Sequence, residues 1–172
     1  MKIQRLTQYI LLKCSSSHTH IQLEKPHPVI SSAVWNGGFV TADHIVNLKV
    51  KKHFEDSPIY EAPEVTLSDY CSNSGWKGLT VGLMTAASMD SLRIISYTEQ
   101  GIEIIALVTA GLANARRAGD YADYREIVEL ETEVGTINTI VVTTASLTPS
   151  AMVEALLLPR KQRLSLCRTL AF

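Results

Sequence analysis

The sequence predicts an α+β fold: a single domain with a mixed, largely antiparallel sheet and two or three helices. Three observations lead to this prediction. Eight segments are dominated by β-branched residues and bounded by turn residues, only two or three segments carry helix signals, and strands and helices do not alternate regularly. With 172 residues, 46% of them hydrophobic, the chain can bury one core but is short for two domains.

The expected strands cover residues 9–13, 20–23, 28–34, 44–51, 79–84, 92–98, 102–109 and 136–144. The link Glu99-Gln100-Gly101 between two of them is short and contains glycine, which predicts an antiparallel hairpin.

Helix signals are fewer. Pro63, followed by Glu64, can begin a helix that ends at the breaker Asn73-Ser74-Gly75. Thr148 can cap a second helix over residues 148–158, with Pro149 at its first position. A third, short helix is expected over residues 113–118.

Composition excludes several classes of function. A formal net charge of -1 gives no electrostatic footprint for nucleic acid or an acidic membrane surface, and no stretch approaches the roughly 20 apolar residues that span a bilayer. Cys14, Cys71 and Cys167 are an odd number without CxxC spacing, so we expect a reducing, cytoplasmic setting. His18 and His20 fall in what looks like a polar loop, so we expect solvated histidines and no metal site. The oligomeric state stays open.

Two polar motifs follow or end expected strands in the first half of the chain. SSAVWNGG, residues 31–38, ends in a glycine pair that permits close backbone approach; it is either a binding loop around Asn36 or a hairpin turn beside a core Trp35. VGLMTAAS, residues 81–88, offers Thr85 as a nucleophile or hydrogen-bond donor, or is a strand that enters a tightly packed helix start.

Two more motifs lie further along. TAGLANARRAGD, residues 109–120, places Gly111 behind a strand, followed by Asn114, Arg117 and Asp120; it can hold a carbonyl or carboxylate, or it is a loop fixed by an Arg-Asp pair. In GTIN, residues 135–138, Asn138 would share the face of the residue two before it, where inward polar groups need partners.

Taken in order, SSAVWNGG, HIVNLKV, VGLMTAAS, VTAGLANARRAGD and GTINTIVV resemble the adenosylcobinamide amidohydrolase family, the CbiZ type of corrinoid-salvage enzymes. The resemblance extends to about Ala155. It implies hydrolysis of the amide that joins the corrin ring's side chain to aminopropanol, with release of adenosylcobyric acid. The corrinoid would then be the substrate, and no cofactor is implied.

For such a reaction we assign a base or nucleophile, donors for the developing oxyanion, and contacts to the substrate. Asp120 is the candidate base, Thr85 or Thr109 the alternative nucleophile, and Asn138 a further catalytic candidate. The candidate substrate contacts are Ser32, Asn36, Gly37, Gly38, Gly111, Asn114, Arg117, Gly135 and Thr136.

The end of the chain departs from the family. Residues 159–172 contain four basic and no acidic residues, and a Thr-Glu-Ala-Lys type motif that the family carries there is missing. If Leu158 ends in A and the next codons are CCG, AGG, AAG, CAA and AGR, reading one base earlier spells Thr-Glu-Glu-Ala-Lys. The sequence therefore predicts an amidohydrolase-like domain over residues 1–158 and a frameshifted tail over residues 159–172.

Two other hypotheses stay open beside the enzyme. The chain is a non-catalytic remnant that still binds a corrinoid, or it is a structural domain whose glycine loops are only turns.

Overall fold

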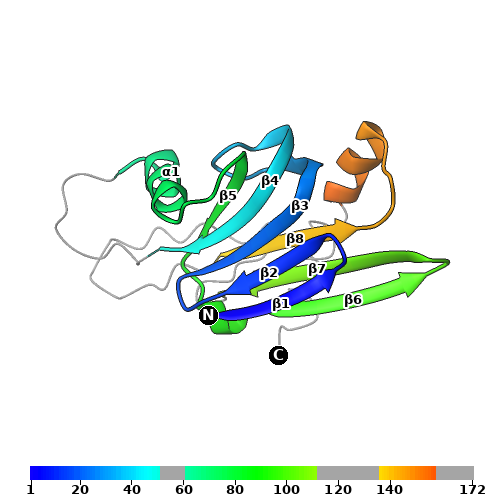
Figure 1. Ribbon diagram of the computed structural model, residues 1–172, viewed down its shortest axis with the longest axis horizontal. Helices are drawn as coiled ribbons and strands as arrows, with labels where there is room; N and C mark the ends of the chain where they lie inside the picture. The colour runs from blue at the N-terminus through cyan, green and yellow to red at the C-terminus, as the bar shows by residue number, and fades with distance from the viewer. Residues whose placement is uncertain (51–60, 112–135, 158–172) are drawn as a thin grey trace, which may run out of the picture.

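The computed structural model describes residues 1–50, 61–111 and 136–157, and within them it shows an α+β domain built on two sheets (Figure 1). Sheet A has the order β1-β2-β3-β4-β5, and sheet B has the order β6-β7-β8. The strands are β1 (Lys2–Thr7), β2 (Ile10–Cys14), β3 (His18–Ser31), β4 (Gly38–Lys49), β5 (Thr80–Thr85), β6 (Arg93–Glu99), β7 (Ile102–Ala110) and β8 (Ile137–Thr143). The predicted fold class is confirmed.

Three helical segments accompany the strands in the described ranges. They are α1 (Pro63–Asn73), the 3-10 helix η1 (Met89–Ser91) and a helix over residues 149–157. Pro63 stands in the first turn of α1, as predicted, and Glu64 complements the helix dipole there.

Sheet A is mixed. Strands β1 to β4 pair antiparallel in chain order, whereas β4 and β5 pair parallel, from His44 opposite Thr80 to Lys49 opposite Thr85. A parallel pair needs a crossover connection, and α1 lies within the segment that makes it. Sheet B is antiparallel throughout.

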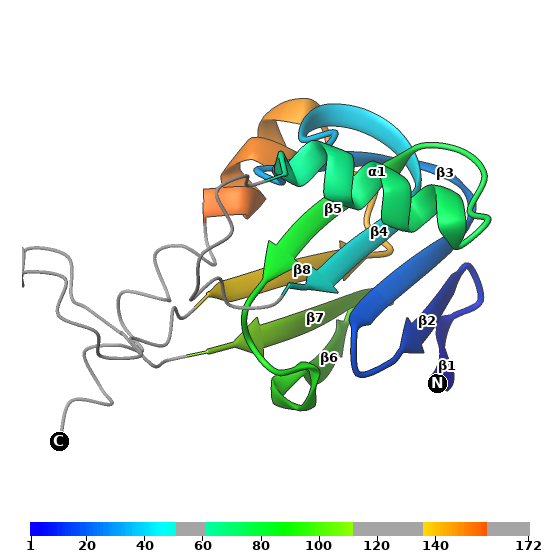
Figure 2. The same ribbon diagram turned by 90° about the vertical axis from the view of Figure 1, so that its left-hand side faces the viewer.

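The main core lies between the two sheets, because side chains alternate along each strand and the inward set is apolar. Figure 2 shows sheet B on one side of sheet A and α1 on the other. The buried residues between the sheets are Ile10, Leu12, Ile21, Leu23, Ala42, Ile45, Val81, Ile105, Leu107 and Ile140. A smaller cluster, Val46, Leu48, Leu67 and Cys71, lies between sheet A and α1.

The β6–β7 hairpin is confirmed. Its turn residues, Gln100 and Gly101, both have positive φ angles, of 50° and 79°. Two-residue turns of this kind match the twist of the strands that they join, and glycine adopts the conformation without strain.

Several strand boundaries differ from the prediction. β1 was not predicted, β4 begins at Gly38 instead of residue 44, and the two strands expected over residues 20–23 and 28–34 are one strand, β3. The pairing of β3 with β4 shifts register between Gln22 and His27, and Glu24-Lys25-Pro26 lies within that irregularity. A bulge tolerates proline and polar residues inside a strand. For this reason the sequence of this segment predicted a turn between two strands.

The helix expected over residues 113–118 lies outside the described residues, while the helix expected over residues 148–158 is present over 149–157. In the described part of the chain, no helix is long and apolar enough to cross a membrane.

Candidate functional site

Four polar side chains, three of them buried and one half-buried, lie between the sheets where β4, β5 and β7 end and β8 begins. They are Asn47 on β4, Thr85 on β5, Thr109 on β7 and Asn138 on β8. Asn47, Thr85 and Thr109 are at most 2% exposed. Figure 2 shows these strand ends together at the left of the view. We call this group the strand-end cluster.

The hydrogen bonds determine which atoms of the cluster donate and which accept. The Asn138 Nδ2 donates to the Met84 carbonyl at 2.9 Å and to Asn47 Oδ1 at 2.8 Å. Because both partners are acceptors, the orientation of the Asn138 amide is determined. Asn47 then presents its Nδ2 to Thr109 Oγ1 at 2.8 Å. Thr109 therefore accepts, and its own hydroxyl proton remains to be donated elsewhere.

Thr85 is held in the same way. Its Oγ1 accepts the backbone N–H of Ala87 at 3.0 Å, so this hydroxyl proton is also left to donate. The turn that follows β5 is tied down by Ser88, which accepts from the Asp90 N–H at the start of η1. The alternative interpretation of VGLMTAAS, a strand entering a tight helix start, thus describes its local structure.

The motifs TAGLANARRAGD and GTIN are neighbours across strands β7 and β8. Thr109 lies opposite Asn138 in the ladder, and the Gly111 N–H donates to the Thr136 carbonyl at 3.0 Å just beyond it. Residues that are 25 and 29 positions apart in the sequence are thereby brought to one edge. The ladder fixes the point from which residues 112–135 leave sheet B.

Burying these side chains carries a free-energy cost that hydrogen bonds offset. An amide or hydroxyl that loses its partner in the interior costs about 1–3 kcal/mol. The three side chains Asn47, Thr109 and Asn138 satisfy one another across two sheets, so each depends on the other two.

Asn47 was not included in the site predicted from the sequence. It lies in HIVNLKV, one of the five family-like motifs, but no role was assigned to it. The available signal was a polar side chain in an apolar strand, on the face shared with Ile45.

SSAVWNGG lies elsewhere, as the connection between β3 and β4. Trp35 forms an antiparallel bridge with Gly82 in mid-β5, and Asn36 Nδ2 donates to the Thr80 carbonyl at 2.8 Å. Thr80 and Thr85 are opposite ends of β5, which places Asn36 about 16 Å from the strand-end cluster. The motif covers the free edge of β5, so its hairpin interpretation describes its structure.

The glycines of this motif fit that role. A Cβ at Gly37 would come within 2.4 Å of the Ala33 carbonyl oxygen, and Gly38 has a φ of 88°. Ser32 is exposed. The substrate-contact roles predicted for Ser32, Asn36, Gly37 and Gly38 therefore stay predictions at a place separate from the strand-end cluster.

Four predicted site residues, Asn114, Arg117, Asp120 and Gly135, lie outside the described residues.

The expectation of solvated histidines was wrong. His18 and His20 belong to β3, and His20 is completely buried against α1's side of sheet A. Its ring stacks on Trp76 with centroids 3.8 Å apart, and its Nε2 lies 3.2 Å from Nδ1 of His44. Regular β3 pairing continues through both positions, so the alternation places both histidines on the same face of the strand, where His20 is buried and His18 is half-buried.

The hydrogen bonds determine which nitrogens carry protons in this pair. His44 Nε2 donates to the Lys77 carbonyl at 3.0 Å, so His44 Nδ1 accepts from His20 Nε2. His20 Nδ1 then has no proton and, among the described residues, no partner. Burial, followed by the charges of His44, Lys13 and His18, lowers the pKa of His20 to about 3.

His18, in contrast, lies in a polar cluster with Tyr70, whose hydroxyl is 2.6 Å from His18 Nδ1. Burial lowers the pKa of His18 below its ordinary value. In the parts of the chain that the structure describes, no group of three or more His, Cys, Asp or Glu side chains is arranged to hold a metal ion. Cys14 and Cys71 are free thiols whose pKa is raised by burial.

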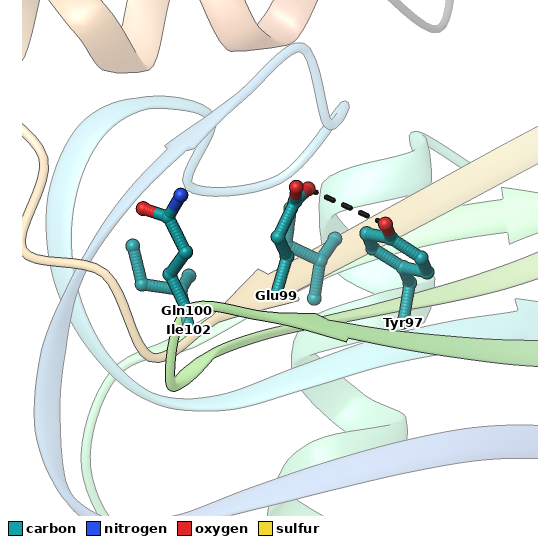
Figure 3. Close-up of a pocket in the computed structure, with 5 residues that line it drawn as sticks. Tyr97, Glu99, Gln100 and Ile102 are labelled. Atoms are coloured by element: carbon teal, nitrogen blue, oxygen red, sulfur yellow. Dashed lines mark hydrogen bonds between the residues drawn. The ribbon is translucent and has the colours of Figure 1, made fainter.

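Two of the hollows on the described surface have no predicted site residue in their lining. One, of about 380 Å³, is lined by Tyr97, Glu99, Gln100, Ile102 and Ile104 at the end of the β6–β7 hairpin (Figure 3). The other, of about 240 Å³, lies between the β1–β2 turn and the far ends of β7 and β8.

Comparisons with known proteins identify relatives. A family model described as adenosylcobinamide amidohydrolase matches residues 4–158. The chain is also similar to an adenosylcobinamide amidohydrolase of Methanosarcina mazei, with 27% identity over 122 residues. That match covers 71% of this chain and 51% of the relative, so the chain spans about half the length of that protein. No solved structure matches. Because the family model covers most of its length, the chain belongs to the adenosylcobinamide amidohydrolase family.

Proposed function

We propose that this protein hydrolyses the amide that joins the corrin ring's propionyl side chain to aminopropanol in adenosylcobinamide. The products are adenosylcobyric acid and the amino alcohol, so a scavenged corrinoid re-enters coenzyme assembly. Membership of the amidohydrolase family supports the reaction class. In this proposal the corrinoid is the substrate and not a resident cofactor.

The strand-end cluster is the observation that links the proposed function to particular residues. It gathers side chains from three family-like motifs, together with Asn47 from a fourth, at one edge of the sandwich. A cluster with no function would be replaced at little cost by apolar side chains of similar shape. Three interdependent polar groups between two apolar sheets, with Asn47 and Thr109 buried and Asn138 half-buried, therefore support a role at the site.

The burial of Thr85 and Thr109 decides which role that is. Both hydroxyls are at most 2% exposed, so the substrate does not meet them as free surface groups. We assign the cluster a positioning role: it holds the strand ends, and through the Gly111–Thr136 contact it sets where residues 112–135 begin. Asp120, Asn114 and Arg117 lie in that segment and are our candidates for base and substrate contacts.

A threonine nucleophile is the alternative within the same proposal. Thr85 Oγ1 accepts a hydrogen bond from a backbone N–H, and Thr109 Oγ1 accepts one from a side-chain amide. Each hydroxyl therefore has a proton left to donate. Attack on the amide would require a base to take that proton. Asp120 is the carboxylate that we assign to this step as well.

The direct test incubates the purified protein with adenosylcobinamide and follows adenosylcobyric acid by chromatography. Release of the acid, lost in the Asp120→Asn variant while the fold is retained, is the expected result. Corrinoid binding in an absorbance titration without any hydrolysis would favour the second candidate, a non-catalytic corrinoid-binding protein.

Residues 159–172 require a separate comparison in the activity assay. The family match ends at residue 158, and residues 159–172 carry the basic composition described above. We propose that a frameshift replaces the family sequence from about Leu158 onward. Resequencing the locus tests this directly, and codons for residues 158–163 that cannot encode an acidic motif in another frame would overturn it. A chain with the frame restored is then assayed beside the present one.

A further inference from the structure

Strand β6 is an open edge. It pairs only with β7 among the described strands, and every one of its seven residues is exposed. The edge of β5 at the other sheet is covered by the Trp35 bridge, whereas β6 has no such cover in the described part of the chain. An uncovered edge presents unpaired N–H and C=O groups that are a template for a further strand.

The face of sheet B that points away from sheet A is apolar at this edge. Ile105 and Leu107 of β7 face the core, so Ile95 and Tyr97 of β6, opposite the alternate β7 residues, face outward. Ile95 is 67% exposed and Tyr97 is 60% exposed. Exposed large apolar side chains that continue across neighbouring strands mark a surface that binds a partner.

The β6 sequence, Arg93-Ile-Ile-Ser-Tyr-Thr-Glu99, is complementary to itself in the antiparallel direction. If two copies pair about Ser96, each Ile95 lies opposite the partner's Tyr97. Each Arg93 then lies opposite the partner's Glu99. Aromatic–β-branched pairs and opposite charges are the cross-strand pairs that stabilise antiparallel sheets.

The side chains at the ends are available for this pairing. Arg93 uses its Nη1 for the carbonyls of Asp90 and Leu92, at 3.0 and 2.9 Å, and its other N–H groups remain. Glu99 forms one wall of the hollow in Figure 3, where Tyr97 donates to it at 3.3 Å. The partner's guanidinium would enter beside a carboxylate and an aromatic ring.

We propose that two copies of this chain associate through their β6 strands, paired antiparallel about Ser96, to form a continuous six-stranded sheet. The two-fold axis passes through the Ser96 pair, perpendicular to the sheet. The contact is isologous and closed, so association stops at the dimer. The occupant of this edge is a second copy because the strand supplies both halves of each pair.

A cysteine scan tests the register. Residues directly opposite in an antiparallel pair have Cα atoms about 4.5–5.5 Å apart, within the range that a disulfide bridges. Ser96→Cys should therefore give a covalent dimer under mild oxidation of the full chain. Thr98→Cys is the matched control: it retains the same native thiols and faces the same side of β6, but in the dimer its two copies lie about 13 Å apart. Equal cross-linking of both variants, or none with Ser96→Cys, would overturn the register.

A charge exchange tests the complementarity. Glu99→Arg places like charges opposite each other at both ends of the contact, and we expect the dimer dissociation constant to rise by about tenfold or more. The double variant Arg93→Glu with Glu99→Arg restores opposite charges and should recover the original dissociation constant. Sedimentation velocity over a wide concentration range measures both. A native chain that stays monomeric, or a double variant no tighter than Glu99→Arg, would refute the proposal.

Discussion

The buried pair His20–His44 predicts that the protein loses stability in mild acid. In the unfolded chain the His20 imidazole titrates at its ordinary value of 6.5, whereas in the folded chain its pKa is about 3. Protonation in the fold would have to occur at Nδ1, which is buried and has no acceptor among the described residues. The proton is therefore accepted far more readily after unfolding.

The difference between the folded and unfolded pKa values of His20 determines how stability changes with pH. Because the folded pKa lies below the unfolded one, the stabilisation is complete above pH 6.5 and is lost as the pH falls toward 3. Each pH unit in that window costs about 1.4 kcal/mol for one group. At pH 5 the loss from His20 is about 2 kcal/mol, which is a large part of a total stability of about 5–15 kcal/mol.

Equilibrium urea unfolding, followed by tryptophan fluorescence at about pH 7.5 and about pH 5, measures the effect. The His20→Gln variant keeps an N–H that can donate to His44 but does not titrate, so its stability should fall less between the two pH values. His27→Gln is the matched control, since His27 lies on the same strand but is only half-buried. If His20→Gln and the native chain lose equal stability in acid, burial of His20 is not the cause.

Two further substitutions test the strand-end cluster and the packing of α1 on sheet A. Asn47→Ala removes the donor to Thr109 and an acceptor of Asn138, so we expect a loss of about 1–3 kcal/mol in unfolding free energy; an unchanged value would contradict the network. Gly82→Ala would place a Cβ 2.9 Å from a methyl carbon of Leu67 and should cost about 1–3 kcal/mol. The double variant with Leu67→Ala should be less destabilised than the sum of the single variants, and additive losses would show that the contact is absent.

Local signals predicted much of the fold. The hairpin at Gln100-Gly101 and the start of α1 at Pro63 depend on the conformations of a few adjacent residues, which sequence specifies directly. β1 was missed because its residues are mostly exposed and polar, so that pairing with β2 alone makes it a strand.

The candidate site was predicted only in part, for a related reason. Thr85, Thr109 and Asn138 were named from separate motifs, and the structure brings them to one edge. Neither the separation of Asn36 from them nor the contribution of Asn47 follows from spacing along the chain. Both depend on how sheet B is placed on sheet A, which is a tertiary property.

The pattern of strand connections has a consequence for how the protein folds. The hairpins that join β1 to β2, β2 to β3 and β6 to β7 close over two or three residues, whereas β4 meets β5, and β7 meets β8, only after long stretches of chain. Closing a longer loop costs more chain entropy, so these two pairings form later. Asn47, Thr109 and Asn138 lie on those late-pairing strands. A refolding chain should thus regain most of its β-structure before the geometry needed for chemistry, and an interrupted one would resemble the finished protein everywhere but there.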